Sequence, residues 1–432
     1  MIVRTAKSFK IDDIPKFKAQ LLEWSRKFDE IVWLDSNSYN QTYGKYDAIL
    51  AVDALSVLST NSKSAFKELK RYQKGINDWI FGHLNYDLKN SIEKLSSSNF
   101  DGLDFPELHM FQPKRLFFLK DDTITFKYHE TVKNLINSDF KIISKIEILA
   151  KDKSSKNIEI QSRISKESYL DKVNQMLSYI HRGDIYEANF CQEFFATNTK
   201  ISPLNVYNHL NKISKPPFAS FVKNGDKYIM SASPERYIAK RGNEIISQPI
   251  KGTAKRSIDH TEDYTLRHNL GANSKERSEN IMIVDLVRND LSHTAIKGSV
   301  VVKELCEVYS FDQVHQMIST ISSKVKESTH PVDIISSTFP MGSMTGAPKV
   351  SAMKIIEALE ETKRGVYSGA VGYISPSNDF DFNVIIRSIL YNDSNKYVSF
   401  SVGSAITSKS DPNLEYDECL IKAQAMNLAL NQ

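Results

Sequence analysis

The chain has 432 residues, 41% of them hydrophobic, which is enough for a sizeable core in one large domain or two smaller ones. Its 56 basic and 52 acidic residues are interspersed and leave a formal charge of only +4, which argues against nucleic-acid binding. Cys191, Cys306 and Cys419 form no close pair of the CxxC kind, so neither zinc nor disulfides are expected. Without a signal core or a membrane-spanning apolar run, a cytoplasmic protein without membrane contact is expected.

The first 150 residues predict a mixture of helix and sheet. Asp12-Asp13 and Pro15 suit the start of a helix over residues 12–28. Short apolar runs predict buried strands at 31–34, 48–52, 79–84 and 115–119. From Lys151 to Gln161 the composition shifts to Lys, Ser, Asn and Asp, which bury little. This stretch predicts a connection between an N-terminal α/β domain (1–150) and a second domain (160–432).

The second domain is predicted to begin with an amphipathic helix that Ser165 starts and Gly183-Asp184 ends. A strand is expected over residues 185–190. Two further strands, at 216–221 and 228–232, lead to Glu235. A carboxyl group at the end of a strand is either a surface residue or an acid aimed into a site.

The stretch Gln248–Arg256 sets one lysine between a proline and a glycine. Pro249 fixes one backbone angle, and Gly252 lets the main chain pass close to a bound ligand. This geometry presents an amine well, so Lys251 is a candidate nucleophile. Lysines beside glycines are also common in exposed turns, which is the alternative interpretation.

Two pairs of glutamates have the same spacing. Glu276 and Glu279 lie three apart on a helix introduced by Asn273, and Glu415 and Glu418 repeat the pattern on a C-terminal helix. Residues three apart share a helix face, so each helix aims two carboxylates at one point. Magnesium prefers such oxygen ligands, although two solvated acidic faces would show the same spacing. The apolar run 281–284 favours burial of the first helix, and buried carboxylates need partners.

The stretch Gly342–Lys349 predicts a glycine-bearing loop that turns into a helix, with Pro348 at the first helical position. Such a helix start offers free amide hydrogens to an anion, but the spacing is not that of a nucleotide-binding P-loop. Arg387 follows the apolar run 384–386, so a strand is expected to hold its guanidinium toward a carboxylate.

Four motifs in this order resemble those of the chorismate-utilising enzymes, a family that includes anthranilate synthase component I, aminodeoxychorismate synthase component I, isochorismate synthase and salicylate synthase. They are Ser233–Arg236, Gln248–Arg256, Glu276–Asp290 and Gly342–Lys349. The resemblance covers roughly residues 165–430. It implies an α+β fold of packed, largely antiparallel sheets flanked by helices, with the site in a cleft.

The resemblance also implies roles for individual residues. Glu235 is expected to act as the general acid for a departing ring hydroxyl. Glu279 and Glu418 are expected to bind Mg²⁺ directly, while Glu276 and Glu415 hold its waters. The positions expected near the substrate are Thr253, Thr345, Tyr367, Arg387, Gly403 and Lys422, of which Lys422 meets a carboxylate.

Within this family, a lysine before the glycine of the second motif marks the aminodeoxychorismate synthase branch, and Lys251 holds that place. The resemblance then implies that Lys251 adds to chorismate, that ammonia displaces it, and that 4-amino-4-deoxychorismate is released on the route to 4-aminobenzoate and folate. Ammonia is expected from a separate glutamine amidotransferase subunit, and a separate lyase is expected downstream. Because free lysine has a pKa of about 10.4, nearby cationic groups and burial are expected to favour its neutral amine.

Three positions depart from the family pattern. Glu187 stands where glutamine is usual and where isochorismate synthases have a lysine base, Gln316 where histidine is usual, and Ala405 where a second glycine is usual. His315 is one residue away from the histidine position and would face the other side of a strand, so no catalytic role is assigned to it.

The alternatives that remain are anthranilate synthase component I and a non-catalytic paralogue that binds chorismate. The segment Leu34-Asp35-Ser36 lies about where feedback-regulated relatives begin a tryptophan pocket, although an ordinary strand end would explain it equally well.

Overall fold

The computed structural model describes residues 4–39, 41–148 and 157–431. The predicted connection at 151–161 therefore lies partly outside the described residues, and the division into two domains stays a prediction. Among the described residues, no helix combines the length and the apolar character needed to cross a membrane.

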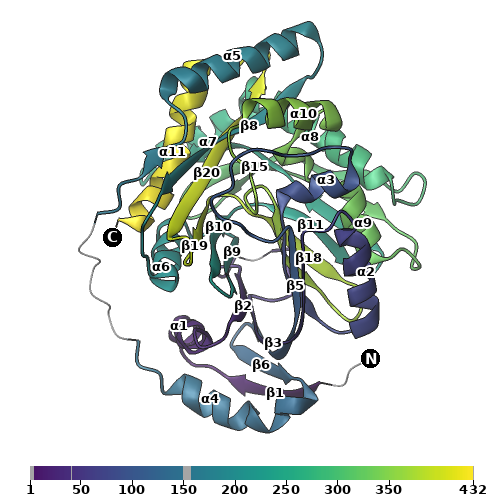
Figure 1. Cartoon of the computed structure of the whole chain (residues 1–432), viewed down its shortest axis with the longest axis vertical. Coiled ribbons are helices and arrows are strands. Elements are labelled where there is room, and N and C mark those ends of the chain that lie inside the picture. The colour runs from purple at the N-terminus through teal and green to yellow at the C-terminus, as the bar shows by residue number, and fades with distance from the viewer. Residues whose placement is uncertain (1–3, 40, 149–156, 432) are drawn as a thin grey trace.

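The structure combines helices and strands along the whole described chain (Figure 1). The helices are α1 (Ile14–Ser25), α2 (Ala65–Ile76), α3 (Lys89–Ile92), α4 (Ile136–Ser144), α5 (Lys166–Arg182), α6 (Pro203–Ser214), α7 (His260–Ala272), α8 (Ser274–Ser292), α9 (Pro331–Thr338), α10 (Lys349–Leu359) and α11 (Pro412–Leu430), with short 3-10 turns η1 (Tyr86–Leu88), η2 (Glu130–Leu135) and η3 (Gly342–Met344). The strands before residue 200 are β1 (Thr5–Lys10), β2 (Glu30–Asp35), β3 (Ala48–Thr60), β4 (Ile80–Leu84), β5 (Leu108–Lys120), β6 (Thr123–Tyr128), β7 (Gln161–Ser162) and β8 (Glu187–Ala196). Those after it are β9 (Phe218–Asn224), β10 (Lys227–Ser233), β11 (Arg236–Arg241), β12 (Glu244–Gln248), β13 (Ile250–Lys255), β14 (Val301–Ser310), β15 (Val314–Lys324), β16 (Gly346–Ala347), β17 (Ala370–Ile374), β18 (Phe380–Val384), β19 (Ser388–Asn392) and β20 (Tyr397–Thr407).

Within the described residues, the named strands pair only in antiparallel fashion, along two arms that meet at the long strand β5. One arm runs β8-β20-β19-β10-β9-β2-β3-β5. The other runs β5-β4-β17-β18-β11-β12-β15, and β15 also pairs with β13 and β14. The pairings β2–β9 and β4–β17 join the first 150 residues to the rest of the chain. The predicted α+β fold of antiparallel sheets with flanking helices is confirmed.

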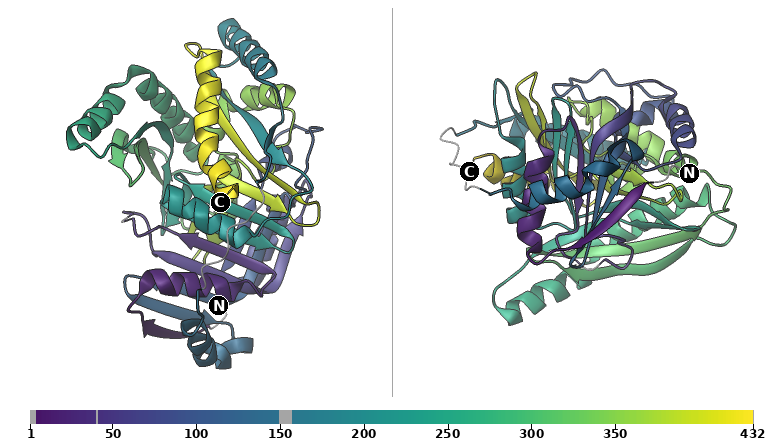
Figure 2. Two further views of the ribbon diagram at one scale, coloured as in Figure 1. Left: turned by 90° about the vertical axis from the view of Figure 1, so that its left-hand side faces the viewer. Right: turned by 90° about the horizontal axis from the view of Figure 1, so that it is seen from below.

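The side chains of the strands alternate between two hydrophobic cores, as the two-residue period of a strand requires. In β2, Ile31 and Trp33 enter a core shared with α1, α5, α6 and α11, while Val32 enters a second core shared with α2, α8 and α9. Figure 1 shows α6 and α11 at the left of the molecule and α2 and α9 at the right, and Figure 2 shows α11 running beside the strands. The buried sheet thus carries helices on both sides.

Several predicted boundaries agree with the structure, and two differ. Asp13 caps α1 by accepting a hydrogen bond from the Lys16 amide at 3.0 Å, and Gly183 ends α5 in the left-handed conformation. The strand expected from residue 185 begins at Glu187, because the Tyr186 amide donates to the Ala347 carbonyl outside the ladder. The helix expected to include Pro348 begins one residue later, at Lys349.

Candidate active site

A β-bulge presents Lys251. The pairing of β13 with β15 shifts between Ile250 and Thr253, which leaves an extra residue in β13, and Gly252 has a φ of +84°. Such bulges re-aim a side chain, and a positive φ favours glycine. A Cβ at Gly252 would lie 3.0 Å from Glu276 Oε2 and 3.1 Å from a methyl group of Leu270. Gly252 therefore lets the main chain approach the glutamate of α8, where the sequence predicted close approach to a ligand.

The lysine is half-buried and surrounded by carboxylates. Across the described residues, its Nζ has no hydrogen bond and no ion pair within 4.0 Å, while its charge acts on Glu187, Glu235, Glu276, Glu279 and Glu418. Cationic groups were expected nearby, and Lys275 and Lys422 act on Glu276 together with Lys251. The carboxylates lie near Lys251 because β13 packs against α8, which carries two of these glutamates.

Glu235 is held in the turn between β10 and β11. Its amide donates to Ser233 Oγ at 3.2 Å, and its side chain is buried. Burial raises the pKa of Glu235 to about 7, against the nearby Ser343 hydroxyl and the charge of Lys251, which lower it. Glu235 and Ser343 also line a cavity of about 10 Å³, close to the smallest that can hold one water molecule. A buried carboxyl group with this pKa can donate a proton near neutral pH.

The four glutamates are carried by two well-capped helices. Asn273 caps α8 by accepting from the amides of Lys275 and Glu276 at 3.0 and 3.1 Å, as its place before the helix predicted. Asp411 caps α11 by accepting from two amides at 2.9 and 3.1 Å. Residues three apart share a helix face, and Glu418 of α11 acts on Glu276 of α8, so glutamates of the two helices lie near one another.

Lysines occupy the space between these helices. Lys275 Nζ lies 3.2 Å from Glu415 Oε1 and 3.8 Å from Glu279 Oε1, and Lys422 Nζ lies 2.5 Å from Glu418 Oε1. Burial raises the pKa of Glu279 to about 7, with Glu276 adding to the rise. Burial and Glu418 likewise raise the pKa of Glu276. Burial alone would raise the pKa of Glu418 as well, but Lys422, Lys275 and Lys251 lower it below its usual value. The carboxylates of α8 are therefore less well neutralised than Glu418.

The residues present fit a hard divalent cation in kind. All four donors are carboxylates, and within the part of the chain that the structure describes Glu279 Oε1 is buried without a hydrogen-bond partner. Among the described residues, no three histidine, cysteine or acidic side chains converge closely enough to hold a metal ion. The apolar run 281–284 favoured burial of α8, and Ile283 and Val284 are buried, whereas Ile281 is 41% exposed, so one face of the helix packs inward.

The expected substrate-binding residues occupy different surroundings. Thr345 is buried, and its hydroxyl donates to the Gly342 carbonyl at 3.2 Å, which holds the loop. The Tyr367 hydroxyl is buried 3.7 Å from Cys191 Sγ. A Cβ at Gly403 would lie 2.5 Å from the same sulfur, so β20 has room only for glycine there. Lys422 donates to the Gly403 carbonyl at 2.8 Å, while Thr253 is exposed.

Arg387 does not lie on a strand, which corrects the prediction. Strand β18 ends at Val384, because Ile385 exchanges backbone hydrogen bonds of 2.9 Å with Ser368 and Gly369 instead of continuing the ladder. Arg387 follows in the left-handed region with a φ of +52°. Burial lowers its pKa, while the nearby Tyr367, Glu418 and Cys419 raise it. The guanidinium therefore still faces the glutamate cluster of α11.

The positions that depart from the family pattern lie in or beside the same region. Glu187 and Gln316 are buried, and each has one side-chain oxygen to which no described residue donates a hydrogen bond. Gln316 pairs in register with Thr253, and Ala405 pairs with Asn189. His315 faces away, as predicted, with Nε2 3.0 Å from Asp263 and Nδ1 2.9 Å from Ser310 Oγ.

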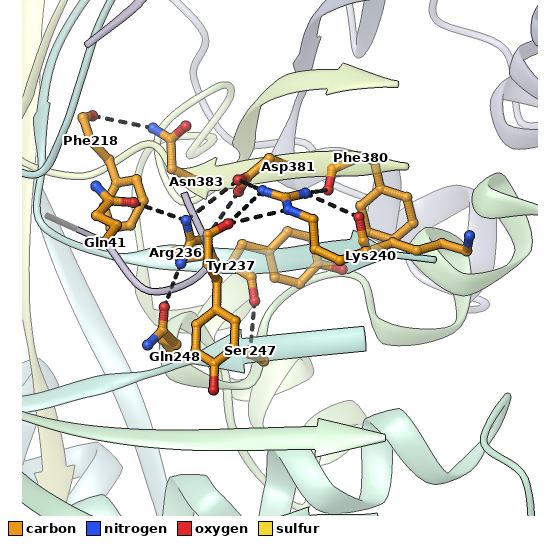
Figure 3. A network of polar contacts seen from close by, with 12 residues as sticks. Gln41, Phe218, Arg236, Tyr237, Lys240, Ser247, Gln248, Phe380, Asp381 and Asn383 are labelled. Carbon is orange, nitrogen blue, oxygen red and sulfur yellow. Dashed lines mark hydrogen bonds and ion pairs between the residues drawn. The ribbon is translucent and has the colours of Figure 1, made fainter. Parts of the chain in front are cut away.

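A polar network surrounds Arg236, the residue after Glu235 in the chain (Figure 3). Arg236 is buried and contacts Asp381, Gln248 and Gln41 at 3.1, 2.6 and 2.9 Å. Through Gln248, Arg236 contacts the end of β12, and through Gln41 it contacts the N-terminal third of the chain. The segment 34–36 lines a cavity of about 60 Å³ together with Arg236 and Asp381, so the position compared with a tryptophan pocket does border a hollow.

Sequence reasoning missed two residues of this region. Lys275 was overlooked, although its spacing of four residues from Glu279 indicates an ion pair on the helix face. Ser343 was overlooked because a loop serine has no sequence pattern that predicts a role. Only the fold shows that it lines the same cavity as Glu235.

Comparisons with known proteins place these features in context. A family described as chorismate binding enzyme matches residues 29–428. Aminodeoxychorismate synthase component 1 of Escherichia coli K12 is 39% identical over 262 residues, 61% of this chain, and the match spans only 57% of that protein. An anthranilate synthase component I-like protein of Synechocystis is 34% identical over 360 residues, which cover 82% of this chain and 72% of the relative.

Two solved structures share the fold. Anthranilate synthase component I of Streptococcus pneumoniae superposes with a TM-score of 0.78 at 23% identity, covering 90% of this chain and 93% of that one. The menaquinone-specific isochorismate synthase of Escherichia coli gives a TM-score of 0.75 at 16% identity, covering 100% and 96%.

Proposed function

This chain belongs to the chorismate-binding enzyme family, and on that premise we propose that it aminates chorismate at C4 to give 4-amino-4-deoxychorismate through a covalent adduct on Lys251. The observation that carries the proposal is the bulge of β13, which presents a lysine that has no hydrogen-bond partner among the described residues and whose charge acts on the buried acid Glu235. A nucleophile and an acid side by side suit a substitution at a ring carbon that bears a hydroxyl group.

In the proposed reaction, the neutral amine of Lys251 forms a bond to the ring while the C4–O bond breaks. Glu235 donates its proton to the departing oxygen, so water leaves. Ammonia then forms the C4–N bond, and the bond to Lys251 breaks with its electron pair returning to the lysine nitrogen. Splitting one substitution into two gives each step a better nucleophile or a better leaving group.

We also propose that Glu279 and Glu418 hold Mg²⁺, with Glu276 and Glu415 holding its waters. The raised pKa values of Glu276 and Glu279 support this assignment, as does Glu279 Oε1, which has no hydrogen-bond partner among the described residues. When bound, the cation supplies positive charge for a substrate carboxylate. Arg387 and Lys422 face the same cluster and are proposed to bind substrate carboxylates, with Thr253, Thr345, Tyr367 and Gly403 framing the ring.

The nitrogen is proposed to come as ammonia from a glutamine amidotransferase subunit, and 4-aminobenzoate is proposed to arise on a separate lyase. Because the match spans 57% of the Escherichia coli aminodeoxychorismate synthase component 1, the activity and the partners are both proposals. The second candidate is anthranilate synthase activity, which the longer match to the Synechocystis protein, over 82% of this chain, favours.

The experiment incubates the purified protein with chorismate, MgCl₂ and an ammonium salt, with and without an aminodeoxychorismate lyase, and identifies the products by chromatography with mass detection. Formation of 4-aminobenzoate only with the lyase is the expected result. Anthranilate formed without the lyase would replace the proposal by the second candidate. No turnover, with or without a glutamine amidotransferase, would instead indicate a paralogue that binds chorismate without converting it.

A further inference from the structure

A serine, a histidine and an aspartate that the amination reaction does not use are joined in line at the hairpin of β14 and β15. Ser310, the last residue of β14, pairs in register with His315 of β15. Its Oγ lies 2.9 Å from His315 Nδ1, and His315 Nε2 lies 3.0 Å from Asp263 Oδ1. A hydroxyl group beside a base that a carboxylate orients is the geometric signature of an activated nucleophile.

The fold brings these three side chains together from segments that are apart in the sequence. Directly paired residues of two antiparallel strands present their side chains on one face of the sheet. Helix α7 packs against β14 and β15, and its first turn carries Asp263. His315 is only 1% exposed, whereas Ser310 is exposed. The base is thus shielded from water, and the hydroxyl group that it contacts is open to a reagent in solution.

The carboxylate decides which ring nitrogen of His315 carries the proton. A charged Asp263 only accepts hydrogen bonds, so Nε2 donates to it, and in the neutral ring Nδ1 is left to accept from the hydroxyl of Ser310. Arg256 Nε and the Ser257 amide also donate to Asp263 Oδ1, at 2.8 and 2.9 Å. These hydrogen bonds, that from Arg256 above all, hold the pKa of Asp263 below its usual value. Asp263 therefore stays charged and can stabilise a protonated imidazole.

From this geometry we propose that Ser310 is an acyl-acceptor site, to which an activated ester transfers its acyl group. The Ser310 Oγ forms a bond to the ester carbonyl carbon while His315 Nδ1 takes the hydroxyl proton. Asp263 stabilises the imidazolium that results. The bond from the carbonyl carbon to the leaving oxygen then breaks, and His315 returns its proton to that oxygen. The products are an O-acyl serine and a free hydroxyl compound, so atoms and charges balance without a further reactant.

The backbone around Ser310 limits the donors that can react. The Phe311 amide donates to the Val314 carbonyl at 2.8 Å, and the Asp312 amide donates to the Tyr39 hydroxyl at 2.9 Å. Neither amide is free to stabilise the oxyanion of a tetrahedral intermediate. The acyl donor must therefore bring a good leaving group, such as the phenolate of an aryl ester. Hydrolysis of the product would have to expel a serine alkoxide, which leaves poorly, so the O-acyl serine is expected to persist.

A second pair of a histidine and a hydroxyl group in the same chain shows a different arrangement. His129 Nδ1 lies 3.0 Å from Thr131 Oγ1, but it also accepts from the Thr131 amide at 3.3 Å and so caps the turn η2. That contact is explained by the backbone alone. At His315 the hydroxyl group of Ser310 occupies Nδ1, and the carboxylate of Asp263 occupies the opposite nitrogen. Thr131 therefore serves as an internal control that is expected to stay unmodified.

The test treats the purified full chain with p-nitrophenyl acetate and follows the release of p-nitrophenolate together with the mass of the intact protein. The acetylated residues are located by peptide mapping, which separates Ser310 from any acetylated lysine. The wild type is expected to take up one acetyl group at Ser310, and Ser310→Ala is expected to lack it. Ser178→Ala is the matched control, because Ser178 is an exposed serine whose Oγ donates to a backbone carbonyl at 3.0 Å. S178A is expected to be acetylated at Ser310 at the wild-type rate.

Two further variants test the role of the base. In His315→Gln, acetylation of Ser310 is expected to slow about 100-fold or more, because general base catalysis is lost. In Asp263→Asn a similar loss is expected, because the side chain no longer fixes Nε2 as the donor. Thermal unfolding of both variants shows whether they are folded. S310A removes one exposed hydroxyl group, so it tests the site even if the other two variants are destabilised.

Two results would overturn the inference. One is a wild type in which Ser310 stays unmodified while other residues are acetylated. The other is acetylation of Ser310 at the wild-type rate in folded H315Q and D263N, which would show that the contacts of His315 only tie α7 to the hairpin. Neither result bears on the amination of chorismate, which is tested separately.

Discussion

Lys275 of α8 reaches Glu415 of α11, with its Nζ 3.2 Å from Oε1, and so joins the two helices that carry the four glutamates. The carboxylate of Glu415 is buried, whereas Lys275 is partly exposed. A lysine therefore supplies, between these helices, the positive charge that a bound cation would also supply.

Replacing Lys275 tests whether a bound cation can supply the positive charge that this lysine provides. In Lys275→Met, the buried Glu415 loses its cation, so the free energy of unfolding without magnesium is expected to fall by about 1–3 kcal/mol. Added MgCl₂ should restore more stability to K275M than to the wild type, because the cation replaces the lost charge. Thermal unfolding with and without MgCl₂ measures both effects. Equal gains in the two proteins would contradict a cation site between α8 and α11.

Glu279→Gln should stabilise the metal-free protein at alkaline pH. The pKa of Glu279 is raised from 4.5 to about 7, so its contribution to stability is full below pH 4.5 and is lost as the pH rises to 7. That loss is at most about 3 kcal/mol, and it should be absent in E279Q. Denaturant unfolding in EDTA from pH 4 to pH 8 tests this expectation.

The same variant should bind magnesium more weakly, because an amide oxygen is neutral. A wild-type stability that does not change across the pH range would show that Glu279 is solvated, and would remove the support it gives to the cation site.

Lys251→Ala should abolish the adduct and lower kcat by at least about 100-fold, because the bulge of β13 then presents no nucleophile. The matched control is Lys255→Ala, which changes an exposed lysine on the same strand. Intact-protein mass after rapid quenching detects the adduct, and product chromatography gives kcat. Full activity of K251A without any adduct would exclude covalent catalysis by this residue.

Glu235 should set the alkaline limb of the pH profile. Because burial raises its pKa to about 7, the protonated acid is available below that pH, and kcat/KM is expected to fall as the pH rises through 7. In Glu235→Gln, kcat should fall about 100- to 10,000-fold, and the remaining activity should lack this limb. A wild-type profile that stays level from pH 6 to pH 9 would contradict the role of Glu235 as the acid.

The sequence by itself determined the local structure and the inventory of chemical groups. Asn273 before α8 and Gly183 after α5 act through the backbone of neighbouring residues, so their roles can be inferred from adjacent positions. The spacing of Glu276 and Glu279 fixes a shared helix face in the same way, and the order of the four motifs indicated the family before any geometry was known.

The tertiary structure decided which groups meet. Arg387 left its predicted strand because Ile385 bonds to the turn at Ser368 and Gly369, and such partners lie outside any local pattern. Lys251 lies near the glutamates of α8 because the sheet brings β13 against that helix. Charge and burial depend on neighbours distant in sequence, so the proton-transfer chemistry of this site follows from the fold and not from the motifs that predicted its members.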